Sequence, residues 1–220
     1  NNSLYNKSKS LFGLYEAREC HIKKIFIVEG ILDAISMRDI GFSSVATSGG
    51  SLSHFQVKAI KKNFSKTIIY LDNDIRGKKN SIILLRKFLN FNVIPLIPVT
   101  TFKDSAEALK LENISLLKRQ LKFSRDFIDH IINKLYSVNF LTQSIKYKSF
   151  KNLFKLINLV KDDKIRNIYH TKIKKAFSKK NNVFPTMYML DNTGKQLISR
   201  SDMIILFVLT RKYSLIKKLK

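Results

Sequence analysis

Cysteine, tryptophan, proline and glycine are all scarce in this sequence. Its 220 residues contain one cysteine, no tryptophan, three prolines and seven glycines. With Cys20 alone, the chain can form neither a disulfide framework nor a cysteine-rich zinc site, and its four histidines are scattered without the spacing of metal ligands. We therefore expect a reduced, intracellular chain that holds no zinc.

Acidic residues and long apolar runs are also few. The chain carries 41 Lys and Arg against 16 Asp and Glu, a net charge of +25, and residues 111–220 hold 24 of the basic residues but only 7 of the acidic ones. Such a balance favours a polyanionic partner, with nucleic acid ahead of an anionic membrane. No stretch approaches the ~18 uninterrupted apolar residues of a membrane span. We expect no membrane partner, and we expect the second half of the chain to contact phosphates.

Between residues 23 and 110 the sequence alternates short apolar runs with amphipathic segments. Runs rich in β-branched residues predict strands over 25–28, 44–47, 67–71 and 93–97. Helices are predicted between them, over about 31–39, from Ser51 or Ser53 to about 63, and from about 76 onward. Strands that alternate with helices indicate an α/β fold with a parallel sheet. Pro95 and Pro98 place the last strand at an edge of the sheet or end it early.

Two of these strands end in carboxylates. Glu29 follows the first strand, and Asp72-Asn73-Asp74 follows the third. The carboxyl ends of parallel strands open into the crevice where ligands bind, so these side chains are expected to converge. Converging carboxylates repel one another unless a cation holds them, and oxygen ligands suit Mg²⁺ or Mn²⁺. We therefore predict a metal site of Glu29, Asp72 and Asp74, although either motif alone is typical of an ordinary turn.

Basic residues follow the second acidic motif at once. Arg76, Lys78 and Lys79 lie at the predicted start of a helix. We predict that they contact a triphosphate or a nucleic-acid template beside the metal site. The alternative is that they are only the solvated start of that helix.

From residue 111 onward the periodicity is helical throughout. Apolar stripes predict helices over 115–122, 125–138, 150–160 and 164–177, which pack as a small bundle. A linker is predicted from Lys179, and a last helix over 203–218.

Several motifs together resemble a known family. Val28-Glu29-Gly30 with Asp33, followed by Asp72-Asn73-Asp74, resembles the Toprim domain that primases, topoisomerases and some nucleases share. Three further stretches resemble, in the same order, segments of bacterial DnaG-type primases: residues 8–17, 50–58 and 102–107. The resemblance covers roughly residues 3–110 and fades beyond them.

The resemblance implies a Toprim-type parallel sheet flanked by helices, followed by an all-α helical subdomain. Residues 1–22 are then the tail of an upstream primase subdomain, 23–110 the Toprim catalytic domain, 111–180 the helical subdomain, and 181–220 a linker and the start of a region that contacts the replicative helicase. Asn1 rather than methionine comes first, and neither a zinc-binding module nor a basic subdomain precedes the matched segment. We therefore expect part of a longer protein, which primes poorly alone.

The resemblance also implies a chemistry. DnaG-type primases make short RNA primers on single-stranded DNA from ribonucleoside triphosphates, through divalent metals held by the Toprim carboxylates. By position, Glu29, Asp72 and Asp74 are the catalytic metal ligands, and Asp33 and Asp104 are outer ligands that bind through water. Lys7 stands where this family carries a catalytically important lysine, although it could be an ordinary surface lysine. The expected location is the bacterial cytoplasm, at the nucleoid, or the equivalent organelle matrix.

The sequence departs from the family at several positions. Ser105 replaces a usual proline, and Asn73 replaces a usual glycine between the two aspartates. The carboxylates themselves are retained, so metal binding is expected to survive. Two other functions stay open: a metal-dependent Toprim nuclease, and a non-catalytic module that binds nucleic acid or the helicase.

Overall fold

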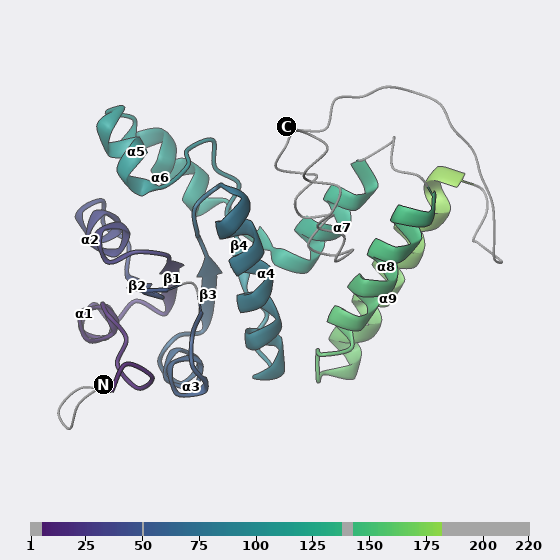
Figure 1. The fold of residues 1–220 in the computed structure, drawn as a ribbon, viewed down its shortest axis with the longest axis horizontal. Coiled ribbons are helices and arrows are strands. Elements are labelled where there is room, and N and C mark those ends of the chain that lie inside the picture. The colour runs from purple at the N-terminus through teal and green to yellow at the C-terminus, as the bar shows by residue number, and fades with distance from the viewer. Residues whose placement is uncertain (1–5, 50, 138–142, 182–220) are drawn as a thin grey trace. The chain divides into compact units, whose positions relative to one another are not determined.

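The computed structural model describes residues 6–49, 51–137 and 143–181 (Figure 1). The helix predicted over 203–218, and the expected helicase-contacting region with it, lie outside the described residues. The chain divides into two compact units, residues 1–127 and 128–220. The division falls after Phe127 rather than after residue 110, because the segment that follows residue 110 packs on the sheet of the first unit.

The first unit is built on a five-stranded sheet in the order β2-β1-β3-β4-β5. Its strands are β1 Lys24–Val28, β2 Ser44–Ala46, β3 Lys66–Ile69, β4 Leu96–Ile97 and β5 Arg125–Asp126. The first four are parallel and confirm the predicted strands, although β4 is shorter than predicted. β5 pairs antiparallel with β4. The sheet is therefore mixed, with four parallel strands and one antiparallel strand. β4 is not the edge strand, but it ends early, at Ile97 before Pro98, which is the other outcome that the two prolines predicted.

Helices cover both faces of this sheet (Figure 1). They are α1 Leu14–Glu19, α2 Ile31–Asp39, α3 His54–Asn63, α4 Ile75–Asn90, α5 Ser105–Lys110 and α6 Ile114–Lys122. Figure 1 shows α2, α5 and α6 on one side, and α3 and α4 on the other. The short helices α1 and α5 were not predicted from the sequence.

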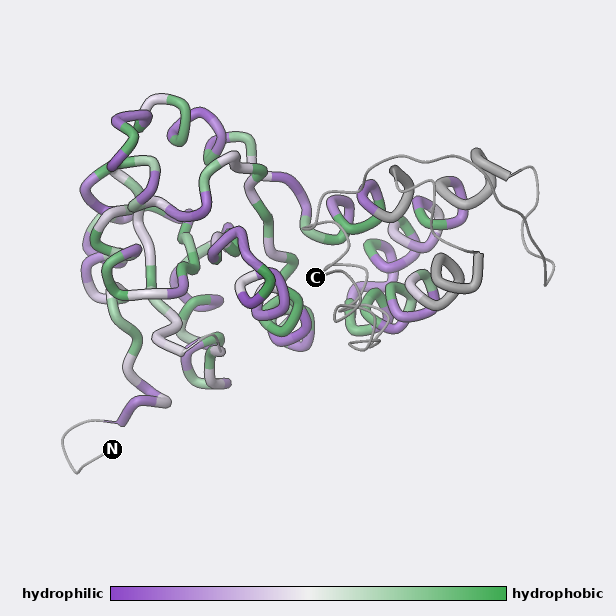
Figure 2. The backbone as a smooth tube through the Cα atoms, turned by 45° about the horizontal axis from the view of Figure 1, so that its top comes forward, coloured by the Kyte–Doolittle hydropathy of each residue, from purple (hydrophilic) through white to green (hydrophobic). Residues whose placement is uncertain are grey.

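Side chains along a strand point alternately to the two faces of the sheet, so each face has its own hydrophobic core. Phe26 and Val28 face the same way in β1 and join a cluster with residues of α2, α5 and α6. Ile25 and Ile27, which alternate with them, are also fully buried. The helices supply one apolar face each, so hydrophobic and hydrophilic residues alternate along their backbones (Figure 2).

Local signals in the sequence fix two of the helix ends. Ser53, rather than Ser51, caps α3: its hydroxyl accepts a hydrogen bond from the backbone N–H of Gln56. After α2, Gly41 adopts φ 92° and its N–H donates to the carbonyl of Arg38, while Phe42 donates to Met37. This is a Schellman ending, as the glycine predicted.

The second unit is helical in its described part. It contains α7 Phe127–Ser137, which begins at the end of the first unit, α8 Gln143–Ile157 and α9 Asp163–Asn181. Helix α8 begins before the predicted residue 150, and α9 continues to Asn181, past Lys179, where the linker was predicted to begin. Among the described residues after 110, the all-α expectation holds except for β5 at residues 125–126. In the described parts of the chain, none of the helices has the length and the apolar composition that crossing a bilayer requires.

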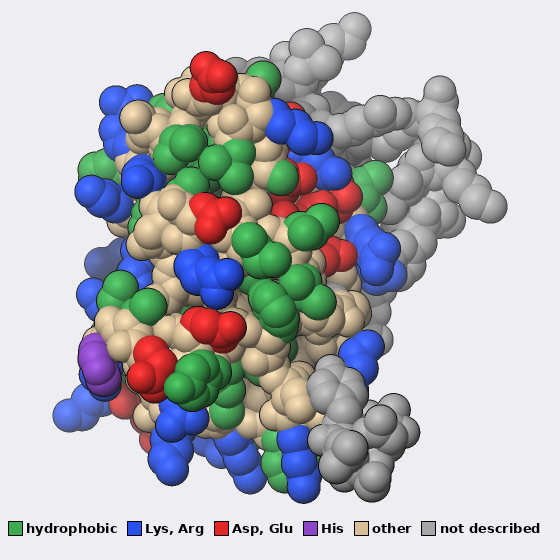
Figure 3. All heavy atoms as spheres, turned by 90° about the vertical axis from the view of Figure 1, so that its left-hand side faces the viewer, with side chains coloured by type: hydrophobic (Ala, Val, Ile, Leu, Met, Phe, Trp, Pro, Cys, Tyr) green, Lys and Arg blue, Asp and Glu red, His purple; other side chains and the backbone are tan. Residues whose placement is uncertain are grey.

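A small apolar pocket of about 140 Å³ lies between α1 and α2. Phe12, Ala17, Ile35 and Phe42 contribute to its lining, and the face that α1 and α2 present carries other hydrophobic side chains among charged ones (Figure 3). None of the predicted metal ligands lines this pocket. The candidate site lies instead at the carboxyl ends of the strands.

Candidate metal and nucleotide site

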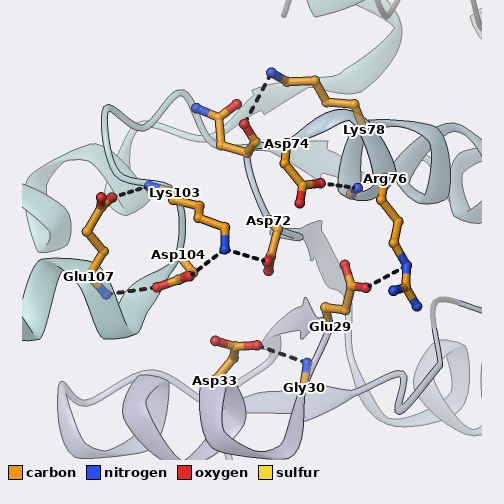
Figure 4. Close-up of polar contacts among 12 residues, drawn as sticks. Glu29, Gly30, Asp33, Asp72, Asp74, Arg76, Lys78, Lys103, Asp104 and Glu107 are labelled. Carbon is orange, nitrogen blue, oxygen red and sulfur yellow. Dashed lines mark hydrogen bonds and ion pairs between the residues drawn. The ribbon is translucent and has the colours of Figure 1, made fainter.

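The fold brings Glu29 and Asp72 to the ends of neighbouring strands. β1 and β3 pair in parallel with Ile27 opposite Ile69, so both chains leave the sheet at the same edge. The chain passes from β1 to β2 on one side and then crosses to β3 on the other. The gap between β1 and β3 is therefore the point where the strand order reverses, which is where open α/β sheets bind their ligands. Figure 4 shows both carboxylates at this point.

Asp72 has the most perturbed carboxylate of this group. Its side chain is 23% exposed. The pKa of Asp72 is raised from 3.8 to about 6, first by burial and then by the negative charges of Asp33 and Glu29, against the opposing effect of Lys103. The shift shows that at least three carboxylates share one electrostatic environment.

Asp33 points to the same space from the first turn of α2 (Figure 4). Its Oδ2 accepts a hydrogen bond from the backbone N–H of Gly30 at 2.9 Å. Burial raises the pKa of Asp33 despite this bond, and the charge of Asp104 raises it as well. The structure therefore brings Asp33 and Asp104 together with the two strand-end carboxylates.

Asp74 and Asp104 each serve as the N-cap of a helix. Oδ1 of Asp74 accepts from the backbone N–H of Gly77 at 2.7 Å at the start of α4. Oδ1 of Asp104 accepts from Glu107 N–H at 2.8 Å at the start of α5. Capping uses one oxygen of each carboxylate and fixes the side chain. This second role was not predicted, although an aspartate just before a helical segment is a cap signal.

Basic side chains lie beside these carboxylates. Arg76 Nε is 3.5 Å from Glu29 Oε1, so Arg76 lies next to the acidic cluster. Lys78 Nζ is 3.5 Å from the backbone carbonyl of Asn73, and Lys79 is exposed on α4. Lys103, which was not predicted as a site residue, places its ammonium 3.7 Å from Asp72 Oδ2. The signal for it was its position beside Asp104 in the matched loop.

Lys7 reaches the same edge of the sheet from the N-terminal segment. Its Nζ lies 4.0 Å from the position that a Cβ on Gly49 would take. Gly49 follows β2, and the neighbouring Ser48 donates its N–H to the carbonyl of Glu29 at 3.1 Å. Lys7 is therefore next to the loop that is tied to Glu29.

Gly77 allows α4 to start close against the backbone of the loop that carries Asp72. A Cβ at this position would lie 2.1 Å from the backbone carbonyl oxygen of Asp72. No side chain fits there, so α4 can start against the backbone of Asp72 only with glycine.

A buried tyrosine, Tyr70, precedes Asp72 by two residues, just after the end of β3. Tyr70 is 6% exposed, and its hydroxyl has no hydrogen-bond partner among the described residues. Burial raises the pKa of Tyr70, and the charges of Asp104, Asp33 and Asp72 add to the rise. Apart from its place in a predicted strand, this residue carries no signal in the sequence that would mark it.

The donor set fits a hard divalent cation. Every predicted ligand is a carboxylate. Burial and then the neighbouring carboxylates raise the pKa of Asp72, and a bound cation would offset both effects. Among the described residues, no three His, Cys, Asp or Glu side chains are grouped tightly enough to hold one ion. Lys103 and Arg76 pair instead with Asp72 and Glu29. The predicted ligand set thus remains a prediction.

Comparisons with known proteins agree with this geometry. Residues 26–109 match a family model described as Toprim-like. A DNA primase of Thermotoga maritima is 32% identical over 128 residues, which are 56% of this chain and 22% of the relative. The chain thus spans about a fifth of that protein.

Solved structures show the same fold. The Aquifex aeolicus primase, with its zinc-binding and RNA polymerase domains, matches with a TM-score of 0.68 and 20% identity over 96% of this chain and 46% of that one. A DnaG primase catalytic domain bound to single-stranded DNA matches with a TM-score of 0.67 and 18% identity over 81% of this chain and 59% of that one. A Toprim-like domain of a primase implies the use of divalent metal in general. Residues 26–109 therefore match a Toprim-like domain, and the chain is similar in sequence to a part of several bacterial DNA primases.

Proposed function

We propose that this chain supplies the nucleotidyl-transfer site of a DNA primase. The observation that carries the proposal is the convergence of Glu29 and Asp72, from two neighbouring parallel strands, at the reversal point of a Toprim-like sheet. Phosphoryl transfer needs positioning and charge neutralisation more than covalent help from the protein. A cluster of carboxylates flanked by basic side chains offers both.

Mg²⁺, with Mn²⁺ as its substitute, is the cation that this donor set suits best. Glu29, Asp72 and the free oxygen of Asp74 would hold it directly, with Asp33 and Asp104 as outer ligands. When bound, such metals activate the attacking 3′-hydroxyl and stabilise the leaving phosphates. The protein's own part is to fix these oxygens through strand ends and helix caps.

The basic residues fit the negative charge of a triphosphate. Arg76 is 74% exposed on its side chain and lies at the rim of the cluster, where it can exchange Glu29 for a phosphate. Lys7, on the side of the β2 loop, is placed for a second such contact. Ribonucleoside triphosphates are the proposed substrates, and Lys78 and Lys79 the proposed contacts to nucleotide or template.

Single-stranded DNA is the proposed template. The matched DnaG catalytic domain binds single-stranded DNA, and the strong positive charge of this chain fits the same partner. We also propose a contact with the replicative helicase and a location where the DNA is replicated, in the bacterial cytoplasm or an organelle matrix.

Template-dependent primer synthesis tests the proposal. The assay uses the chain together with the N-terminal region that is expected to precede it in the longer protein. This protein is given a single-stranded DNA template, Mg²⁺ or Mn²⁺ and labelled ribonucleoside triphosphates, and the RNA products are resolved by length. We expect products that require the template and that Asp74→Asn abolishes. Cleavage of single-stranded or structured RNA without any synthesis would instead establish the nuclease.

A further inference from the structure

Gln56 is a buried polar residue whose side chain is fully engaged. It lies in the first turn of α3 and is 6% exposed. Its amide nitrogen donates to the carbonyl of Lys7 at 3.0 Å and to the carbonyl of Ser10 at 2.6 Å. Both acceptors lie more than forty positions earlier in the chain, so this one side chain of α3 binds the N-terminal segment at two points.

The other half of the same amide belongs to the helix cap. Oε1 of Gln56 accepts the backbone N–H of Ser53 at 2.7 Å, and the Ser53 hydroxyl accepts the N–H of Gln56 at 3.1 Å. This is a reciprocal capping box. The Ser53 hydroxyl also donates to the carbonyl of Ser8. Each member of the box therefore contacts the N-terminal segment as well as the helix.

The segment that is held in this way carries Lys7. Its ammonium lies beside Gly49, in the loop whose Ser48 N–H and Thr47 hydroxyl both donate to the backbone carbonyl of Glu29. A second cation of the segment, Lys9, lies 5.6 Å from the ring centroid of Phe55 on α3. Residues 7–10 are therefore packed along the start of α3, next to the loop that is tied to Glu29.

We infer that Gln56 is a positioning residue for Lys7: through its bonds to the carbonyls of Lys7 and Ser10, it holds the Lys7 ammonium at the carboxylate edge of the sheet. The inference rests on the proposed function for the role of Lys7, but the placement itself stands on hydrogen bonds alone. Without the Gln56 donor, the carbonyls of Lys7 and Ser10 are better satisfied by water, which favours release of the exposed segment. The ammonium then samples solvent instead of one position beside Gly49.

Gln56→Glu removes the hydrogen bonds to the N-terminal segment but keeps the hydrogen bond of the helix cap. A glutamate at this position still accepts the N–H of Ser53, as in the commonest capping box, but above the pKa of its carboxyl it has no N–H for Lys7 and Ser10. Gln56→Met removes the donor without adding charge. Gln120→Glu is the matched control, because Gln120 also donates and accepts through its amide, to Thr101, far from the N-terminal segment.

Limited proteolysis with trypsin at pH 8 tests directly whether Gln56 holds the N-terminal segment in place. Cleavage after Lys7 and Lys9 is followed by mass spectrometry of the released N-terminal peptides. Because two hydrogen bonds are removed, we expect cleavage at these sites to speed up roughly tenfold or more in both Gln56 variants, and not in Gln120→Glu. Unchanged cleavage in both Gln56 variants would overturn the inference. A melting temperature close to wild type in Gln56→Glu shows that the cap has survived.

A double-mutant cycle tests the link to Lys7. Binding of a fluorescent ATP analogue with Mn²⁺ is measured in Lys7→Met, Gln56→Met and the double variant. If Gln56 acts through Lys7, both single variants weaken binding and the double variant is no weaker than Lys7→Met. Effects that add would overturn the inference, as would wild-type binding in Lys7→Met. Loss of binding in Asp72→Asn is a separate result that bears on the proposed function alone.

Discussion

The ammonium of Lys103 lies 3.7 Å from Oδ2 of Asp72 and 3.9 Å from Oδ2 of Asp104. One cation thus joins the loop after β3 to the loop before α5. The backbone of Lys103 is fixed at both ends, since its N–H donates to Glu107 Oε2 at 2.5 Å and its carbonyl accepts from Asn73 N–H at 2.8 Å. The side chain is 55% exposed. It can therefore leave the carboxylates without any movement of the loop.

Removing this cation is expected to strengthen metal binding. A divalent ion has to displace the Lys103 ammonium from Asp72, or share the carboxylate with it. At about 4 Å in a largely solvated site such a charge is worth about 1 kcal/mol, so Lys103→Met should raise Mn²⁺ affinity roughly fivefold. Titration by calorimetry measures it, with Lys110→Met on α5 as the control for net charge. A weaker affinity in Lys103→Met would show that the lysine supports the metal site instead.

The stability of the metal-free protein should fall as the pH rises through the range between the unfolded-state and folded-state pKa values of Asp72. The folded-state pKa of about 6 lies above the ordinary 3.8, so between these values the folded protein holds a proton that the unfolded chain has released. Stability then decreases with increasing pH in that range. Asp72→Asn, which cannot ionise, should unfold at a higher temperature than wild type at pH 8 in a chelator. The advantage should shrink towards pH 4. An equal effect of Asp72→Asn at both pH values would contradict the assigned environment.

Gly77→Ala should damage both the fold and the metal site. The new methyl group meets the carbonyl oxygen of Asp72 at 2.1 Å, so α4 or the acidic loop must move. We expect a loss of about 1–3 kcal/mol in the free energy of unfolding and weaker Mn²⁺ binding. Gly41→Ala is the matched control: it has φ 92° but open space, so it should cost about 1 kcal/mol of backbone strain and leave Mn²⁺ binding intact. Similar Mn²⁺ affinity in both variants would refute the close-approach argument.

Binding of single-stranded DNA should depend strongly on salt. Lys151, Lys155 and Lys174 are exposed on α8 and α9. If they contact phosphates, changing all three to Gln should make the slope of log K against log salt shallower by roughly 0.7 for each phosphate that is no longer neutralised. Fluorescence anisotropy across a salt series measures the slope. The same change at the exposed Lys58, Lys61 and Lys62 of α3 serves for comparison. An unaltered slope in the α8–α9 variant would mean that those lysines are only solvated.

Much of the fold was predictable because its signals are local. β1, β2 and β3 are short β-branched runs, and Gly41 and Ser53 mark helix ends by their backbone and side-chain chemistry. β5 could not be found in this way. It is two residues long, begins what looks like a helical stripe, and exists because Leu96 and Asp126 pair across a gap in sequence. Such a pairing leaves no periodicity to detect.

The candidate site was predictable in part for the same reason. Glu29 and Asp72 stand at the ends of recognisable strands, so the sheet alone brings them together. The roles of Lys103, Gln56 and Tyr70 depend on which loop lies against which, and this is decided by tertiary packing. A lysine in a sequence with 41 basic residues does not stand out until a distance is known.

Mn²⁺ binding to wild type and to Glu29→Gln/Asp72→Asn tests the central claim most directly. The claim is that carboxylates at the ends of β1 and β3 form one divalent-metal site. We expect saturable binding to wild type that raises its melting temperature by mass action, and at least roughly tenfold weaker binding in the double variant, because a charged hydrogen-bonding ligand is worth about 1.5–3 kcal/mol. Asp126→Asn, which removes one carboxylate charge on β5 at the end of the strand order away from β1, should bind as wild type. Wild-type affinity in the double variant would contradict the account.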